Sequence, residues 1–231
     1  MTSTGTKGDR TREAILARAV DVACRVGLGG LTIGDLASHT GLSKSGLYAH
    51  FGSKEALQLA VVDAAAQEFT AAVVLPALRA PRGHERVLAL LEAWLACGRE
   101  RLPGGCLFVK ASTELDEQPG PVREHLAEQH RELARTIARI FSSGVGEGQV
   151  RPDADPTQFA VDLYGVMLAY YHSHRLLADP RAQDRARAAV VALLDAARPE
   201  GHGAPPPDGL DPTSRPAPTS HPDPLPTGAT R

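Results

Sequence analysis

Small polar and cationic side chains are concentrated between Thr32 and Lys54, in the stretch TIGDLASHTGLSKSGLYAHFGSK. Thr32 and Ser43 each precede a short amphipathic segment. A helix that begins after such a residue offers free backbone N–H groups to an anion. Lys44 and Lys54 add positive charge at the same places. Groups of this kind bind phosphate, so the stretch is a candidate contact for nucleic acid.

The apolar residues of this stretch predict two short helices joined by a tight turn. Ile33 and Leu36 share one face of the first helix, and Leu47 and Phe51 form an i, i+4 pair in the second. Gly41 lies between them, where a turn needs a residue with a free backbone. This arrangement is typical of a helix-turn-helix unit that spans Thr32 to Phe51.

The outward face of the second helix is better suited to phosphate than to bases. If Leu47 and Phe51 face inward, Ser45 and Ala49 point most directly outward, and Gly46 lets the backbone approach a groove. This face carries no Arg, Asn or Gln, the side chains that contact bases in pairs of hydrogen bonds. We therefore expect Lys44 to carry most direct readout, with DNA shape and dimer spacing supplying the rest of the specificity.

Helical periodicity extends over most of the remaining chain and predicts an all-α protein of about nine helices. The first helix is expected from Thr11, and the fourth is expected to run from Ser53 until Pro76 ends it. From Pro199 onward, ten of the chain's 18 prolines fall in 33 residues, which predicts a disordered tail. The predicted parts are a disordered arm at 1–8, a DNA-binding domain at 9–69, an effector and dimerisation domain at 70–198, and the tail at 199–231.

Several other classes of protein are disfavoured by the sequence. Three scattered cysteines without a CxxC pair predict neither a disulfide framework nor a metal site. No nucleotide loop, dinucleotide fingerprint or nucleophile elbow is present, so we expect no enzymatic activity and no cofactor. The N-terminus lacks an apolar signal segment, and no apolar run reaches the length of a membrane span. We expect a cytoplasmic protein, associated with the nucleoid when bound to DNA and without a membrane partner.

The phrase GLSKSGLYAHFGSKEAL, preceded by LTIGDLASHT and an amphipathic helix, resembles the tetracycline-repressor (TetR) family of transcriptional regulators over about residues 9–69. The resemblance implies a homodimer in which each subunit joins a three-helix head to a helical body. It also implies double-stranded DNA with a palindromic operator as partner, and a small-molecule effector that releases the DNA. Repression is the expected direction, since a dimer on a promoter blocks polymerase, and activation is the alternative.

The resemblance assigns roles to individual positions in this sequence. Phosphates and bases are expected to contact Thr32, Ser43, Lys44, Ser45, Gly46, Tyr48, His50 and Lys54. The last two helices are expected to form the dimer interface through Phe159, Leu163, Val166, Tyr170, Val190 and Leu193. Large side chains on the helices of the body are candidates for the effector cavity, namely Trp94, Phe108, Tyr164, Met167, Tyr171 and His174.

Three alternatives stay open at the level of sequence. Cys106 follows two glycines at a predicted helix start, so it is either a redox-sensing thiol or a buried inert one. The basic residues Lys7, Arg10 and Arg12 either extend the DNA contact or belong to a solvated tip. A helical enzyme is the rival class of function.

Overall fold

The computed structural model describes residues 7–101 and 105–199, and every regular element in these ranges is helical. The described residues all belong to one compact unit. Within the described ranges the elements join into nine continuous helical stretches, so the predicted all-α class is confirmed. The predicted arm up to residue 6 and the predicted tail from residue 200 lie outside the described residues.

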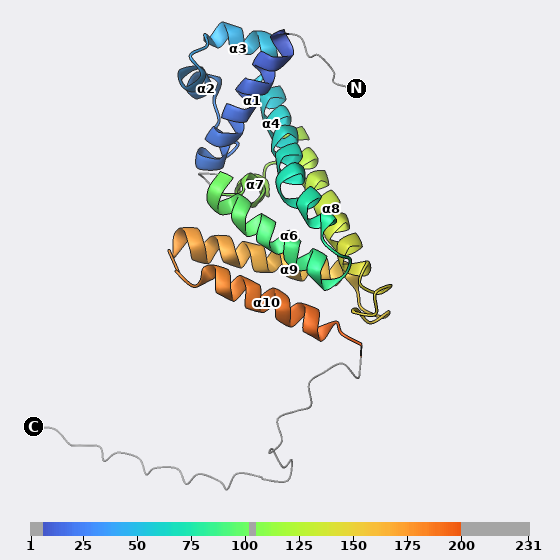
Figure 1. Ribbon diagram of the computed structural model, residues 1–231. Coiled ribbons are helices and arrows are strands. Elements are labelled where there is room, and N and C mark those ends of the chain that lie inside the picture. Colours follow the sequence, from blue (N-terminus) through green and yellow to red (C-terminus); the bar gives the residue numbers. More distant parts are fainter. Residues whose placement is uncertain (1–6, 102–104, 200–231) are drawn as a thin grey trace, which may run out of the picture. The chain divides into compact units, whose positions relative to one another are not determined.

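Three helices form the head at one end of the described chain: α1 (Lys7–Val26), α2 (Ile33–Thr40) and α3 (Lys44–Phe51) (Figure 1). Helix α1 begins at Lys7 rather than at Thr11, so residues 7 and 8 of the expected arm are helical, as are residues 9 and 10 after it. Periodicity could not reveal these turns, because the apolar stripe begins only at Ile15. Asp9 in the first turn favours the earlier start by its interaction with the helix dipole.

The prediction that Pro76 ends the fourth helix is wrong. Helix α4 (Lys54–Phe69) continues through the π-helical turn η1 (Thr70–Val74) into α5 (Leu75–Arg79). A proline ring clashes with the preceding turn of a regular α-helix, and the wider π turn directly before Pro76 relieves that clash. The predicted domain boundary after residue 69 therefore falls inside one continuous helix, which the head and the body share.

This long helix is also the one stretch among the described residues that is apolar and long enough to cross a bilayer by composition alone. Its inner face packs against α1 and α8, with Leu57, Val61, Val62 and Phe69 buried. A helix of this composition is therefore accounted for by its place inside the helical bundle.

The remaining helices form the body, in which α9 packs against both α8 and α10 (Figure 1). Trp94, Leu163, Met167 and Val190 are among its fully buried side chains. The bounds of these elements are α6 (His84–Ala96), η2 (Cys97–Arg101), α7 (Leu107–Leu115), α8 (Pro121–Ser142), α9 (Pro156–Tyr171), η3 (His172–Leu176) and α10 (Ala182–Ala196).

Helix α9 begins at a strong N-cap, which leads to a stability prediction. The Asp155 carboxylate accepts hydrogen bonds from the backbone N–H groups of Thr157 (2.8 Å) and Gln158 (3.1 Å). Asp155→Ala removes both, and we expect the free energy of unfolding to fall by about 1 kcal/mol in urea denaturation. Asp153→Ala is the matched control, because Asp153 makes only an exposed ion pair with Arg151. Equal stability of the two variants would contradict the assignment of the cap.

Candidate functional site

Two side-chain caps and one glycine set the relative directions of α2 and α3. Thr32 accepts the backbone N–H of Asp35 at 3.0 Å, and Ser43 accepts that of Gly46 at 3.1 Å. Gly41 between the helices has a φ of 69°, in the left-handed region that favours glycine. Both expected caps and the expected turn are therefore confirmed, and they orient the helix-turn-helix unit.

Helix α3 buries two residues and presents the remainder of its surface to solvent. Leu47 and Phe51 are buried, whereas Tyr48 is 52% exposed. Of the other predicted contact residues, Gly46 and His50 are half-buried, and the exposed ones are Thr32, Ser43, Lys44, Ser45 and Lys54. The predicted set is thus brought together on the surface of one end of the chain.

The start of α1 lies beside α3. The guanidinium of Arg12 lies 5.3 Å from the centre of the Phe51 ring, within the range of a cation–π contact. Arg10 and Arg12 are both exposed. The basic residues expected in a loose arm therefore belong to a helix that packs next to the second helix of the motif, and they add positive charge near its surface.

Lys54 already has a partner inside the chain. Its ammonium group donates to the Gly29 carbonyl at 2.7 Å, and Gln58, one helical turn later, donates to the Leu28 carbonyl at 2.7 Å. Helix α4 thereby holds the loop between α1 and α2. The Lys54 ammonium group has further N–H donors besides the one bonded to the Gly29 carbonyl, and a phosphate contact would use those.

Helix α7 of the body grips the end of α1 from another direction. Lys110 donates to the carbonyls of Cys24 (2.7 Å) and Arg25 (2.8 Å). Glu114 accepts from the backbone N–H groups of Leu28 (2.8 Å) and Gly29 (2.5 Å). We call these four bonds the α7 clasp. Sequence reasoning missed it, although a lysine and a glutamate four residues apart on a helix share a face.

Glycine makes room for this clasp. A Cβ atom added at Gly29 would lie 2.4 Å from the Glu114 carboxylate, and one at Gly27 would lie 2.5 Å from it. Gly27 also has a φ of 86°. Gly27 directly follows the last residue of α1, and both glycines let the half-buried Glu114 carboxylate reach the backbone of the loop.

The residues predicted to bind the effector divide into separate groups. Trp94 and Met167 are fully buried in the core, and Tyr171 is buried as well. Trp94 contacts the ring of Tyr164, with centroids 6.1 Å apart. His174 stacks on Tyr170, whose ring in turn contacts that of Tyr171 with centroids 5.2 Å apart.

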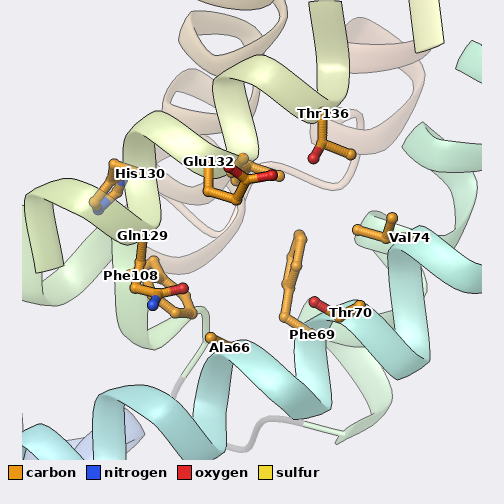
Figure 2. Close-up of a pocket in the computed structure, with 10 residues that line it drawn as sticks. Ala66, Phe69, Thr70, Val74, Phe108, Gln129, His130, Glu132 and Thr136 are labelled. Atoms are coloured by element: carbon orange, nitrogen blue, oxygen red, sulfur yellow. The ribbon is translucent and has the colours of Figure 1, made fainter. Parts of the chain in front are cut away.

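A cavity of about 190 Å³ lies between the α4–η1 helix and α8 (Figure 2). Of the six predicted residues only Phe108 lines it. In Figure 2, Phe69 stands between the two helices, and Glu132 and Thr136 face it from α8. His130 borders this cavity and also a hollow of about 310 Å³ that is lined in part by Tyr164. Sequence reasoning missed Phe69 and His130, which no local motif marks.

Comparison with known proteins identifies the fold. Residues 15–61 match the model of bacterial regulatory proteins of the tetR family, and residues 83–190 match that of the tetracyclin repressor-like C-terminal domain. The chain belongs to the TetR family. It is therefore a DNA-binding transcriptional regulator, as predicted.

Individual TetR relatives support the assignment. The chain is 28% identical over 151 residues to the HTH-type transcriptional repressor ComR of Escherichia coli K12, covering 64% of this chain and 72% of ComR. A TetR regulator from Chloroflexus aurantiacus is 28% identical, with a TM-score of 0.72 over 82% of this chain and 94% of that one. AibR, solved with isovaleryl coenzyme A and operator DNA, is 22% identical, with a TM-score of 0.62 over 78% and 97%.

Four of the six residues predicted for the TetR dimer interface lie in the interior of the chain. Phe159, Leu163, Tyr170 and Val190 are buried in the core of a single subunit, and Val166 and Leu193 are half-buried. These four side chains therefore belong to the core of the single subunit. The apolar side chains that α9 and α10 expose are different ones, Val161, Leu168 and Val191.

The redox alternative receives no support from the geometry. Cys24, Cys97 and Cys106 are all buried. Burial raises the pKa of the Cys24 thiol to about 12 and also raises that of Cys106. The thiolate is the reactive form of cysteine, so both thiols are deactivated at neutral pH. The inert alternative is the one that fits.

This leads to a prediction about thiol reactivity. With a pKa near 12, only about one Cys24 thiol in 10,000 is ionised at pH 8, against roughly a quarter of an unperturbed thiol. Iodoacetamide should therefore modify Cys24 and Cys106 at least about 100-fold more slowly in the native protein than in denaturing urea. Peptide mass spectrometry gives the rate at each cysteine, with glutathione as the reference thiol. Rapid native labelling of Cys106 would revive the redox mechanism.

Proposed function

We propose that the protein is a homodimeric repressor that binds a palindromic operator and leaves it when a small molecule binds the body. The observation that carries the proposal is the surface of α3, where Lys44, Ser45 and Tyr48 are exposed above a buried Leu47 and Phe51. Helices with this geometry enter the major groove of DNA. A regulator of this kind works in the cytoplasm and needs no catalytic residues.

The relatives favour repression and effector release. ComR is a repressor by name, and AibR was crystallised with both an acyl coenzyme A and operator DNA. In the present chain the α7 clasp supplies a route between an effector and the head. A molecule that displaces α7 would shift Lys110 and Glu114, and with them the end of α1.

The outer faces of α9 and α10 supply a surface for a second copy. Val161 (59% exposed), Gly165, Leu168 and Ala169 form one stripe along α9. Val191 (44% exposed) lies on α10 beside the exposed small residues Ala188 and Ala192. Small residues let helices approach closely, and a twofold axis would pair each stripe with its copy.

The DNA-binding proposal is tested by selecting bound sequences from random duplexes with the full chain. We expect a palindrome, because a symmetric dimer reads two equivalent half-sites. On the selected site, Lys44→Ala should weaken binding by about 10-fold and reduce the slope of log affinity against log salt by about 1. Arg131→Ala is the control, because Arg131 is an exposed arginine on α8, in the body and outside the DNA-binding head.

Two results would overturn the proposal. One is a selection that yields no enriched sequence. The other is a Lys44→Ala protein that binds the operator with unchanged affinity and unchanged salt dependence while Arg131→Ala behaves the same.

The dimer surface predicts the effect of a charge on α10. Val191→Asp places two carboxylates near the twofold axis, where they repel each other. Sedimentation equilibrium should therefore show a dissociation constant of the dimer that is at least about 100-fold higher. Val145→Asp is the control, because Val145 is similarly exposed (38%) but follows α8. Circular dichroism should show both variants folded. A Val191→Asp protein that remains as dimeric as the control would remove this surface from the proposal.

A further inference from the structure

The hollow of about 310 Å³ is bordered by α7, α8 and α9. Its apolar wall consists of Leu115, Leu126 and Ala127, and His130 and Tyr164 close one side. An apolar cavity of about 150 Å³ accommodates benzene, and ligand sites begin at about 300 Å³. The space therefore suits a single substituted ring.

Two polar atoms at this hollow are buried without a hydrogen bond to any described residue. They are Nε2 of His130 and the hydroxyl of Tyr164, whose rings meet edge to face with centroids 5.5 Å apart. The Ser112 hydroxyl lies beside Tyr164 but donates to the Val109 carbonyl at 2.9 Å. Buried polar groups normally have a hydrogen-bond partner. Two such groups without one at the same hollow therefore indicate a binding function.

The protonation states of the two groups define what they can bind. Burial lowers the pKa of His130, so its ring is neutral. In one of the two neutral tautomers Nε2 carries the free lone pair and can accept a hydrogen bond. Burial raises the pKa of Tyr164, so that side chain keeps its proton and can donate. An acceptor beside a donor matches one hydroxyl group.

The charges around the hollow argue against an ionic ligand. One guanidinium and one carboxylate border it, those of Arg123 and Asp116, so their charges cancel. Arg123 donates to the Asp116 carbonyl at 3.0 Å, and the Asp116 carboxylate accepts the Glu117 N–H at 2.8 Å. A charged ligand would lose its hydration in the hollow and would find no unpaired opposite charge there.

We propose that this hollow binds an uncharged, ring-sized molecule whose hydroxyl group donates to His130 and accepts from Tyr164. The assignment rests on the proposed function, since it names the chemical class of the effector. Ser112 and Leu115 at the hollow belong to α7, the helix that carries Lys110 and Glu114. An occupant of the hollow therefore touches the same helix that holds the head.

The test compares two probes of equal size, 4-methylphenol and 1,4-dimethylbenzene, with the full-length protein. Calorimetry should give a dissociation constant at least about 10-fold lower for 4-methylphenol, the effect of satisfying buried polar groups. 4-Methylbenzoate, the charged probe, should bind more weakly than 4-methylphenol. Tyr164→Phe should remove most of the preference for the phenol and leave the affinity for 1,4-dimethylbenzene within about twofold.

Tyr170→Phe is the matched control, because the Tyr170 hydroxyl is also buried without a hydrogen bond to a described residue but does not line the hollow. It should keep the full preference. Both variants keep the aromatic ring and lose one hydroxyl group, and their melting curves are recorded to show that each is folded. Equal affinity for the two probes, or an unchanged preference in Tyr164→Phe, would overturn the inference. Operator binding is measured on the same samples. Loss of operator binding would count against the proposed function. Operator binding together with equal affinity for the two probes would count against this site alone.

Discussion

The organisation of the described chain depends on one joint, a set of hydrogen bonds from α7 and α4 side chains to the backbone of residues 24–29 at the end of α1. Lys110 and Glu114 hold this segment from α7, and Lys54 and Gln58 hold it from α4. The groups bound are carbonyls that the end of α1 leaves unsatisfied and N–H groups of the loop that follows it. Removing Lys110 or Glu114 would take away a hydrogen-bond partner from two of these backbone groups at once. The head is therefore attached to the body through its backbone, and this attachment fixes the direction of the whole first helix.

A joint of this kind matters for the proposed way of reading DNA. The outward face of α3 carries Lys44, Ser45 and Ala49, side chains suited to phosphates more than to base edges. If each head contributes little base discrimination, specificity comes from the separation of two heads and from DNA shape. In the proposed function the body sets that separation and the clasp transmits it, so that small rotations of α1 change the affinity for a palindrome.

The sequence predicted those features whose causes are local. Thr32, Gly41 and Ser43 act on the backbone within three residues, so their spacing alone identified caps and a turn. The clasp and the pairing of His130 with Tyr164 join residues far apart in the chain, which no local pattern marks. The exposed faces of the last two helices could not be predicted for a related reason. Helix α9 is apolar on nearly all sides, so periodicity could not separate the buried Leu163 from the exposed Val161.

Effector control in this fold is limited by the free energy that distinguishes two positions of α7. A ligand shifts the equilibrium only by the difference between its affinities for the two states. The four clasp bonds hold α7 in one position, and each contributes about 1 kcal/mol. Coupling free energies of 1–3 kcal/mol are typical of allosteric proteins. In the proposed mechanism, four bonds of about 1 kcal/mol each give the clasp roughly 4 kcal/mol. That is somewhat more than this range, so an effector bound against α7 would need to weaken only part of the clasp.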